Sequence, residues 1–198
     1  MLITAHRVKH TVYHFVVAIM REYAKQVYMM KKVTGFTLVE MMITLTVMVI
    51  VLAVGVPSFI QISRNNSLAI HANELVAALN MARSEAVKRG EQVTVAPTGA
   101  EWEDGWHIFT DGNDTGTLDA GELELQVYDA IKDGYTLRTG AHFNLYVAYL
   151  PTGMSKGNGG ANDTFRLCAD NQDTAQARAI IINLVGRIRT EQGTALCP

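Results

Sequence analysis

The sequence predicts an α+β fold in which one long N-terminal helix packs on a small domain of antiparallel strands. Two observations lead to this prediction. An apolar run followed by an amphipathic helical pattern covers residues 36–90, and short strand-like segments divided by turn residues cover residues 91–198. Because no second helical pattern interrupts the strand-like part, we expect its strands to pair antiparallel and to cover the apolar side of the helix.

The first half of the predicted helix is long enough to cross a membrane. The 21 residues from Phe36 to Val56 contain a single charged residue, Glu40. At about 1.5 Å per helical residue they span roughly the 30 Å of a hydrocarbon core. A carboxylate in such a helix costs roughly 2.5–3.5 kcal/mol at the bilayer centre, so Glu40 should lie near an interface or meet a cationic partner.

The pattern of residues 58–90 predicts that the helix continues beyond Pro57, where we expect a kink. Lys88 and Arg89 suit the negative end of the helix dipole, and Gly90 suits the position after the last turn. Apolar residues recur every three or four positions: Ile62, Leu68, Ala72, Leu75, Val76, Leu79, Ala82, Ala86 and Val87.

Residues 91–198 contain short segments with strand character, separated by Gly, Asn, Asp and Pro. The run 155–162 is rich in glycine and asparagine and is interpreted as a mobile surface loop. The predicted strands are Gln92–Ala96, Trp106–Thr110, Leu123–Tyr128, Tyr135–Arg138, Leu145–Leu150, Thr164–Cys168, Arg178–Leu184 and Arg187–Thr190.

The charge of the chain is unevenly distributed. Residues 1–35 carry six Lys and Arg against one acid, whereas the rest carries 11 basic and 18 acidic residues, a net charge of −7. The basic start places the beginning of the helix in the cytoplasm and residues 58–198 outside it, by the positive-inside rule. The acidic balance of the rest argues against a broad basic surface for nucleic acid, so any such binding would be local.

Two cysteines, Cys168 and Cys197, both lie on the outer side of that topology. Because the export compartment is oxidising, a disulfide between them is expected. Their spacing fits no zinc pattern. The sequence has no Gly-x-Ser-x-Gly elbow and no P-loop, so we predict that the protein is not an enzyme.

An acidic segment matches the ligand spacing of a calcium loop. Oxygen-bearing side chains stand at positions 1, 3, 5, 7, 9 and 12 of residues 111–122: Asp111, Asn113, Thr115, Thr117, Asp119 and Glu122. Those are the positions that an EF-hand loop uses for calcium. The flanking segments resemble strands, however, so the alternative is a hairpin connection rich in turn-forming residues. Calcium is the only candidate cofactor.

The run Lys31-Lys32-Val33-Thr34-Gly35-Phe36-Thr37-Leu38-Val39-Glu40 resembles the class III signal of type IV prepilins and type II secretion pseudopilins. The resemblance implies a leader, residues 1–35, that prepilin peptidase removes between Gly35 and Phe36, followed by N-methylation of Phe36. A start at Met30 would leave a leader of six residues, the length usual in this class. The resemblance also implies a type IV pilin-like fold, with residues 36–57 as membrane and filament-core helix and residues 91–198 as a periplasmic domain.

In that family the position of Glu40 serves assembly, where its carboxylate would pair with the terminal amine of a neighbouring subunit. The implied partners are other pilins or pseudopilins, the inner-membrane assembly platform and the prepilin peptidase/N-methyltransferase. The implied location is the bacterial inner membrane, and then a pilus or pseudopilus, with the domain at or near the tip.

The stretch Gly186-Arg187-Ile188-Arg189, together with Phe165–Cys168, Ala177–Ile182 and the terminal Cys197-Pro198, resembles the C-terminal part of GspH/FimT-type minor pilins. In FimT-like members a G-R-x-R motif is associated with DNA binding, so Arg187 and Arg189 are the implied phosphate contacts. Other basic side chains, such as Lys156 and Arg178, would have to assist. Two alternatives stay open: a purely structural or priming pseudopilin in which both arginines are solvated, and a calcium-dependent membrane-anchored adhesin.

Overall fold

The computed structural model describes residues 18, 21, 36–194 and 197 of the chain. The predicted leader, which ends at Gly35, lies outside the described residues except for Ala18 and Arg21. The chain divides into two compact units, Met1–Val54 and Gly55–Pro198, which we describe separately.

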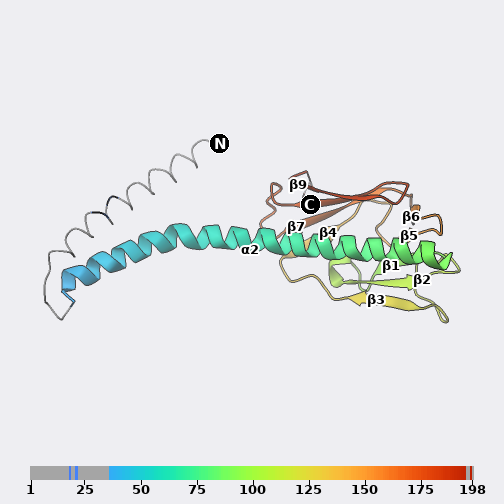
Figure 1. Ribbon diagram of the computed structural model, residues 1–198, viewed down its shortest axis with the longest axis horizontal. Coiled ribbons are helices and arrows are strands. Elements are labelled where there is room, and N and C mark those ends of the chain that lie inside the picture. The colour runs from blue at the N-terminus through green and yellow to red at the C-terminus, as the bar shows by residue number, and fades with distance from the viewer. Residues whose placement is uncertain (1–17, 19–20, 22–35, 195–196, 198) are drawn as a thin grey trace. The chain divides into compact units, whose positions relative to one another are not determined.

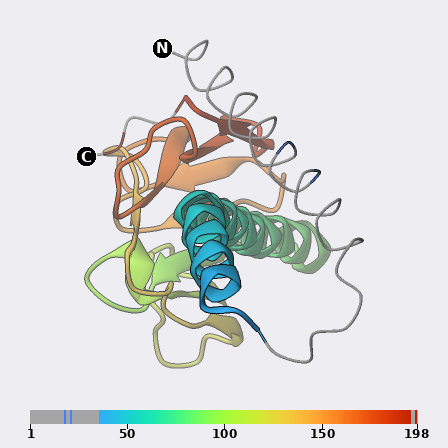
Figure 2. The same ribbon diagram turned by 90° about the vertical axis from the view of Figure 1, so that its left-hand side faces the viewer.

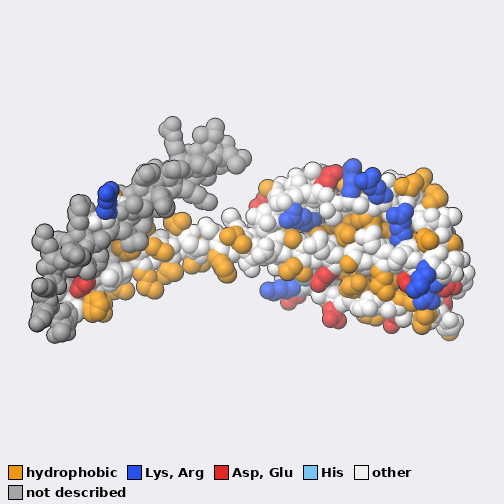
Figure 3. All heavy atoms as spheres, in the orientation of Figure 1, with side chains coloured by type: hydrophobic (Ala, Val, Ile, Leu, Met, Phe, Trp, Pro, Cys, Tyr) orange, Lys and Arg blue, Asp and Glu red, His pale blue; other side chains and the backbone are white. Residues whose placement is uncertain are grey.

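Helix α2 runs from Leu38 to Arg89 with Pro57 inside it, which confirms the predicted single long helix (Figure 1). In the first unit the helix exposes its large apolar side chains. Among the described residues, α2 is the one helix long and apolar enough to cross a membrane, and none of its most apolar stretch is buried. Orange side chains mark this stretch in Figure 3. The exposed set includes Leu38, Val39, Met41, Met42, Leu45, Met48, Val49, Val51 and Leu52, and Phe36 just before the helix is exposed as well.

Two threonines in this apolar stretch have their hydroxyl groups satisfied within the helix. Thr44 Oγ1 donates to the Met41 carbonyl at 2.9 Å, and Thr46 Oγ1 donates to the Met42 carbonyl at 2.8 Å. Such bonds to a preceding turn remove the need for water around a hydroxyl. The hydroxyl groups of these two threonines therefore need no hydrogen bond to water and are compatible with the hydrocarbon core of a membrane.

In the second unit α2 has a buried stripe of small and medium apolar residues. These are Leu68, Ala72, Leu75, Ala78, Leu79, Ala82 and Ala86. The alanines let the strands approach the helix closely, and the leucines fill the space between them. Of the residues predicted from periodicity, Ile62 and Val87 are exposed. The helix ends where predicted, with Gly90 at φ +71° and its N–H bonded to the Ala86 carbonyl.

Among the residues that the structure describes, nine strands form two antiparallel sheets around this part of α2. Sheet A has the order β3-β2-β1-β5-β6, and sheet B has the order β4-β7-β8-β9. A short 3₁₀ helix, η1, covers Trp102–Asp104. The strands are β1 Val93–Pro97, β2 Trp106–Thr110, β3 Glu124–Tyr128, β4 Tyr135–Arg138, β5 Val147–Tyr149, β6 Ser155–Gly157, β7 Asp163–Ala169, β8 Arg178–Ile182 and β9 Ile188–Gln192.

The helix lies between the two sheets, as the view along it shows (Figure 2). The core joins Leu75 and Leu79 of α2 to Val95 and Ile108 of sheet A and to Phe165 of sheet B. All five side chains are fully buried. Burying a Leu, Ile, Val or Phe side chain contributes about 1.5–3 kcal/mol each, so this three-layer contact is the main source of stability of the unit.

The interpretation of residues 155–162 as a loop is wrong at its start. Ser155–Gly157 form β6, which pairs with β5 through Tyr149↔Ser155 and Val147↔Gly157. Ser155 is buried, and its Oγ lies 2.6 Å from the Ala161 carbonyl and 2.7 Å from the Asn183 carbonyl. The small residues that suggested a loop are required by packing, since a Cβ on Gly157 would lie 2.2 Å from the His142 carbonyl oxygen.

Candidate functional site

The predicted assembly residue Glu40 lies in the first turn of α2. Thr37 caps the helix, because its Oγ1 accepts a hydrogen bond from the Glu40 N–H at 3.2 Å. Thr37-Leu38-Val39-Glu40 is therefore a helix start with the T-x-x-E spacing of a capping box, a signal that the sequence contains and that our prediction missed. The positive end of the helix dipole favours a carboxylate at this position.

The neighbouring Phe36 is 76 % exposed, while the other processing residue, Gly35, lies outside the described residues. The roles of Gly35, Phe36 and Glu40 in processing and assembly therefore stay predictions.

The G-R-x-R motif forms the tip and the first residues of a hairpin between β8 and β9. The Gly186 N–H donates to the Asn183 carbonyl at 2.8 Å, and the Arg187 N–H donates to Asn183 Oδ1 at 2.8 Å. Gly186 has φ +75°, the left-handed conformation that three-residue hairpin loops require. The turn thus fixes where the last strand begins, with Arg187 just before it and Arg189 within it.

Arg83 of α2 anchors this hairpin to the helix. Its Nη2 donates to the Val185 carbonyl at 3.0 Å, and its Nε donates to the Gly153 carbonyl at 3.0 Å. One guanidinium therefore bridges the β8–β9 turn and the turn before β6. No local pattern in the sequence identifies this role, because both carbonyls that Arg83 binds are at least 70 residues away.

Both predicted arginines are exposed on the edge of sheet B. Arg189 belongs to β9 and pairs with Glu191 through Nη2 and Oε1 at 3.2 Å, while its side chain stays 64 % accessible. The strand register places Arg166, Ala179 and Glu191 side by side on the same face of the sheet as Arg189. That face is opposite to the buried Phe165, and in Figure 3 blue side chains gather over the region where β9 runs.

The two basic residues expected to assist lie elsewhere. Arg178 is on the helix side of sheet B, where its Nη2 donates to Asn65 Oδ1 at 2.8 Å. Lys156 is on β6 of sheet A and pairs with Asp114. The strand register instead places Arg166, on β7, on the same face of sheet B as Arg189, two strands away from it. Cross-strand pairing of this kind is not visible in a single sequence.

The acidic segment that matched a calcium loop is held in place by hydrogen bonds to one buried carboxylate. Asp111 is fully buried and accepts four hydrogen bonds: from Gln92 Nε2 at 3.0 Å, Thr94 Oγ1 at 2.8 Å, and the N–H groups of Thr115 and Gly116 at 3.0 Å. Two oxygens offer about four lone-pair sites, so these donors occupy its accepting capacity. The geometry favours the hairpin connection.

The other predicted ligands also bond to one another. Asp119 Oδ2 accepts from Asn113 Nδ2 at 2.9 Å and from Thr115 Oγ1 at 2.8 Å, which lowers the pKa of Asp119. Glu122 accepts from the Asp119 N–H, and the Thr117 hydroxyl lies 3.1 Å from that of Thr115. Within the described residues, no group of three or more His, Cys, Asp or Glu side chains is arranged to hold a metal ion. Calcium binding stays a prediction.

The predicted disulfide is confirmed. Cys168 and Cys197 are joined with an S–S distance of 2.04 Å and a Cα–Cα distance of 5.8 Å. The bridge ties the C-terminal segment to β7, and Ala177 and Ala179 pack around it in a small second cluster. The described residues contain no free cysteine.

Comparison with protein families identifies the family to which the chain belongs. The prokaryotic N-terminal methylation motif matches residues 30–56, and the family described as Type II transport protein GspH matches residues 71–186, more than half of the chain. The chain belongs to the GspH family. The resemblance to minor pilins and pseudopilins seen in the sequence is thereby confirmed. No curated protein matches the chain.

Two solved structures share the fold of this GspH-family chain. The type IV minor pilin FimU of Pseudomonas aeruginosa has a TM-score of 0.52 and 23% identity, covering 67% of this chain and 94% of that structure. The minor pseudopilin EpsH from the type 2 secretion system of Vibrio cholerae has a TM-score of 0.50 and 14% identity, covering 65% and 98%. At these identities the comparison establishes the type IV pilin fold.

The GspH match ends at Gly186, so Arg187 and Arg189 lie just beyond it. Members of this family are filament subunits, and the chain is a minor pilin or pseudopilin of a type IV pilus or a type II secretion system.

Proposed function

We propose that the chain is inserted in the inner membrane by the first part of α2 and is then incorporated, through the same segment, into a pilus or pseudopilus. The observation that carries this proposal is the exposed apolar surface of residues 38–56, which contrasts with the buried stripe of residues 68–86. A surface of that kind requires lipid or other apolar helices around it. Inside a filament, neighbouring helices replace the lipid.

Glu40 supports the second step of this proposal. Removal of residues 1–35 would expose the amine of Phe36 four residues before Glu40. A carboxylate held at a helix start can pair with the amine of an incoming subunit, and the pair becomes stronger as water is excluded. The domain is proposed to lie in the periplasm before assembly and near the filament tip afterwards.

The test is Glu40→Ala in cells that form the filament, with Thr37→Val as the control. The Thr37 variant removes the capping oxygen but keeps the carboxylate. We expect Glu40→Ala to be inserted, cleaved after Gly35 and methylated normally, as measured by mass spectrometry, yet to be missing from sheared filaments. Incorporation of Glu40→Ala at the normal level would refute the role of the carboxylate, and an equal defect in Thr37→Val would assign the effect to helix capping.

A second proposed function is contact with DNA through Arg187 and Arg189. It is favoured by their exposure on an edge strand and by the presence of Arg166 on the same face. Because residues 36–198 carry a net charge of −7, contact with DNA would be weak for one subunit and would depend strongly on salt. Several subunits on one filament would strengthen it.

The DNA test compares Arg187→Ala/Arg189→Ala with Lys88→Ala/Arg89→Ala, which removes the same charge from the end of α2. If the arginines bind phosphate, only the first variant should lose a gel shift with duplex DNA, and the salt dependence should fall by about one unit per arginine. Equal behaviour of the two variants would remove the DNA function and leave a structural or priming subunit.

A further inference from the structure

The turn between β8 and β9 exposes two large aliphatic side chains. Leu184 and Val185 occupy its central positions, and each is more than half exposed. The hydrogen bond from the Gly186 N–H to the Asn183 carbonyl closes the turn, so its shape does not depend on either side chain. Tight turns are dominated by Gly, Pro, Asn, Asp and Ser, and two adjacent aliphatic residues are unusual there. We call Leu184 and Val185 the aliphatic turn.

Hydrogen bonds from β6 and α2 hold the aliphatic turn in a fixed position. Ser155 of β6 donates twice: its Oγ to the Asn183 carbonyl at 2.7 Å and its N–H to the Leu184 carbonyl at 3.3 Å. Arg83 of α2 donates to the Val185 carbonyl at 3.0 Å. An apolar side chain on a fixed backbone loses little conformational freedom when it binds a partner, so this turn is suited to act as an anchor at an interface.

The end of α2 lies beside the aliphatic turn. Its residue Val87 is more than half exposed. A Cβ on Gly153 would lie 3.4 Å from Val87 Cγ2 and 3.3 Å from Nε of Arg83, the residue that binds the Val185 carbonyl. Val87 therefore extends the apolar surface of the turn.

The charges around this apolar surface are mainly positive. Lys88 and Arg89 end the helix, and Arg187, which is exposed, follows the turn in the chain. The acid Glu85 pairs with both residues at the helix end, at 3.2 Å and 2.7 Å. Figure 3 shows orange and blue side chains together at the end of the domain where α2 ends. A partner for this surface should carry exposed apolar side chains among acidic ones.

Another part of the same unit has such a surface. Residues 118–129, which include β3, contain four acids and neither lysine nor arginine. Leu123 and Val127 are about half exposed, and β3 is an edge strand of sheet A. An edge strand also presents backbone N–H and C=O groups with which a partner can pair. We call residues 118–129 the acidic edge; its acids are Asp119, Glu122, Glu124 and Asp129.

The two surfaces lie on opposite sides of α2, near the same end of it. The aliphatic turn belongs to sheet B and β3 to sheet A, and α2 lies between the two sheets (Figure 2). The Thr110 N–H donates to the Leu123 carbonyl at 3.0 Å, and the Asp111 N–H donates to the Gln92 carbonyl at 2.9 Å, which places Leu123 near the end of the helix. One copy cannot bring the two surfaces together. Two copies can, and because the surfaces differ, the contact repeats in one direction.

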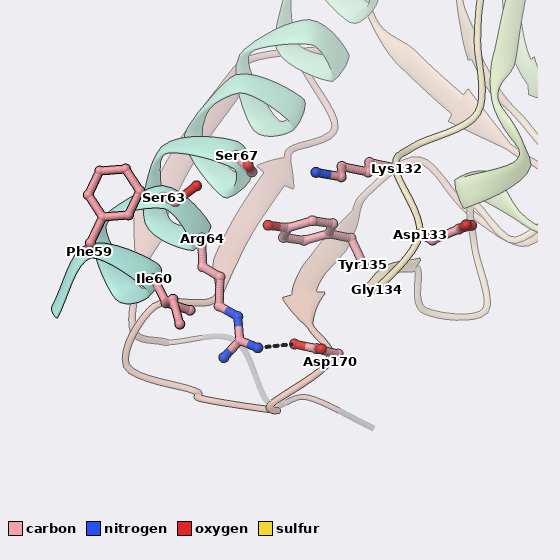
Figure 4. Close-up of a pocket in the computed structure, with 10 residues that line it drawn as sticks. All are labelled: Phe59, Ile60, Ser63, Arg64, Ser67, Lys132, Asp133, Gly134, Tyr135 and Asp170. Atoms are coloured by element: carbon pink, nitrogen blue, oxygen red, sulfur yellow. Dashed lines mark ion pairs between the residues drawn. The ribbon is translucent and has the colours of Figure 1, made fainter. Parts of the chain in front are cut away.

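The pocket beside α2 is a poorer fit for the aliphatic turn (Figure 4). It has a volume of about 270 Å³, and part of its edge is apolar. Arg64 in its wall is neutralised by Asp170, with 3.4 Å between Nη2 and Oδ1. The Lys132 amine points toward the helix, whereas the Asp133 carboxylate points away from it. The remaining positive charge in the pocket would repel Arg187 of an incoming subunit.

We propose that the aliphatic turn of one subunit binds the acidic edge of a second copy of this chain. The two aliphatic side chains would contact Leu123 and Val127, and Arg187 would lie among the acids. Copies joined in this way form an open row, which is the arrangement that a filament requires. The proposal deepens the proposed filament function and rests on it: the first part of α2 holds the subunits together, and the new contact joins their domains.

The experiment joins the two surfaces by a disulfide in cells that form the filament. Two differently tagged full-length copies are produced together, one with Val185→Cys and the other with Val127→Cys. After oxidation, non-reducing gels of sheared filaments and of membranes show the cross-linked pair. Two controls replace Val127→Cys by Ile60→Cys, which lies at the pocket, or by Ile70→Cys, an exposed position of α2. The native cysteines are already paired with each other.

We expect Val185→Cys to cross-link with Val127→Cys at least about tenfold more than with either control, because a specific contact raises the effective concentration of the two thiols. Leu184→Ser in the first copy should lower that yield at least about fivefold, through loss of buried apolar area. Arg187→Glu should also lower it, and Glu124→Arg in the second copy should then restore it. DNA binding explains neither the effect of Leu184→Ser nor the restoration by Glu124→Arg.

Leu184→Ser should keep the wild-type denaturation midpoint, because the side chain is exposed. A yield no higher than that of the controls, or one unchanged by Leu184→Ser, would overturn the contact. Cross-linking mainly to Ile60→Cys would assign the turn to the pocket instead. Loss of Leu184→Ser from filaments without any cross-link to Val127→Cys would mean that the turn binds a different subunit, and the second copy would be the wrong partner.

The amount of subunit in sheared filaments, measured by immunoblotting, reports separately on the filament function. Subunits that are present in filaments but do not cross-link would overturn this contact alone. Subunits that are absent from filaments would overturn the filament function, and the cross-link in the membrane fraction would then decide whether the contact exists.

Discussion

Asp111→Asn should strongly destabilise the domain, because the substitution keeps the size of the buried side chain but removes its charge and part of its capacity to accept hydrogen bonds. The buried carboxylate accepts four hydrogen bonds, two from side chains and two from backbone N–H groups. An amide has one accepting oxygen with two lone pairs, and its NH₂ group would face the remaining donors. At least two donors would then be left unsatisfied, at about 1–3 kcal/mol each. We expect a loss of about 2–6 kcal/mol in the free energy of unfolding.

The assay is guanidinium denaturation of the full chain in maltoside, followed by tryptophan fluorescence. Both tryptophans, Trp102 and Trp106, are buried in the domain, so the signal reports on that unit alone. Asp119→Asn, which changes an exposed carboxylate of the same segment, is the matched control and should have a much smaller effect. A wild-type midpoint for Asp111→Asn would refute the anchoring role.

The same assay with calcium or a chelator tests the other interpretation of this segment. If Asp111 were a calcium ligand, calcium would stabilise the wild type, and Asp111→Asn would abolish that stabilisation. If the carboxylate is an internal anchor, the loss in Asp111→Asn should be the same with and without the ion. A stabilisation by calcium that Asp111→Asn removes would restore the calcium-dependent adhesin as a candidate.

Three further predictions use the same denaturation assay. Replacing Cys168 and Cys197 together by alanine should cost about 3–4 kcal/mol, and reductant should have no effect on that variant; a midpoint equal to that of the oxidised wild type would contradict it. Leu75→Ala, at a fully buried position of α2, should cost about 2.7–5 kcal/mol, and a loss below about 1 kcal/mol would mean that the helix–sheet contact is loose. Lys156 lowers the pKa of the Asp114 carboxyl in the folded state. Their ion pair therefore stabilises the folded state at pH values above the pKa that this carboxyl has in the unfolded chain. The stabilisation is lost as the pH falls through the lower pKa of the folded state. Lys156→Met should therefore reduce the loss of stability below about pH 4, and an unchanged acid slope would contradict the pairing.

Much of the fold could be predicted because its signals are local. The apolar run, the buried stripe after Pro57 and Gly90 together define α2 from the sequence. The place of each strand within its sheet could not be predicted. The alternation of Leu123, Leu125 and Val127, for example, indicates a strand but not which strands lie next to it. β3 proves to be an edge strand, on which Val127 is about half exposed, as is Leu123 just before the strand. A register shift between Ile108 and Phe109 of β2 changes its pairing, and pairing of that kind depends on contacts distant in sequence.

The candidate functional residues also divide into those with a local signal in the sequence and those whose partners are distant in sequence. Glu40, Arg187 and Arg189 stand in short motifs, so the sequence was sufficient to select them. Arg83 and Arg166 were missed, because their partners are distant in sequence: Arg83 contacts a carbonyl 102 residues away, and Arg166 reaches the motif face only through two strand pairings. The residues of the segment do have the spacing of a calcium loop. Two of the four donors to Asp111, however, come from Gln92 and Thr94, in and just before β1, and could not be predicted from the segment itself.

The glycine and the arginines of the G-R-x-R stretch have separable roles. Gly186 adopts φ +75°, and a Cβ there would lie 2.1 Å from the Gly153 carbonyl oxygen, the same atom that Arg83 Nε binds. Gly186→Ala should therefore cost about 2 kcal/mol or more, because strain and collision act together. It should also weaken DNA contact indirectly by displacing the hairpin. Such a loss would say nothing about recognition of phosphate, since a subunit without any affinity for DNA would need the same glycine. Only the exposed Arg187 and Arg189, whose side chains the fold does not require, can distinguish the two functions. A Gly186→Ala variant with wild-type stability would show that the turn tolerates the side chain and that neither strain nor collision makes glycine necessary there.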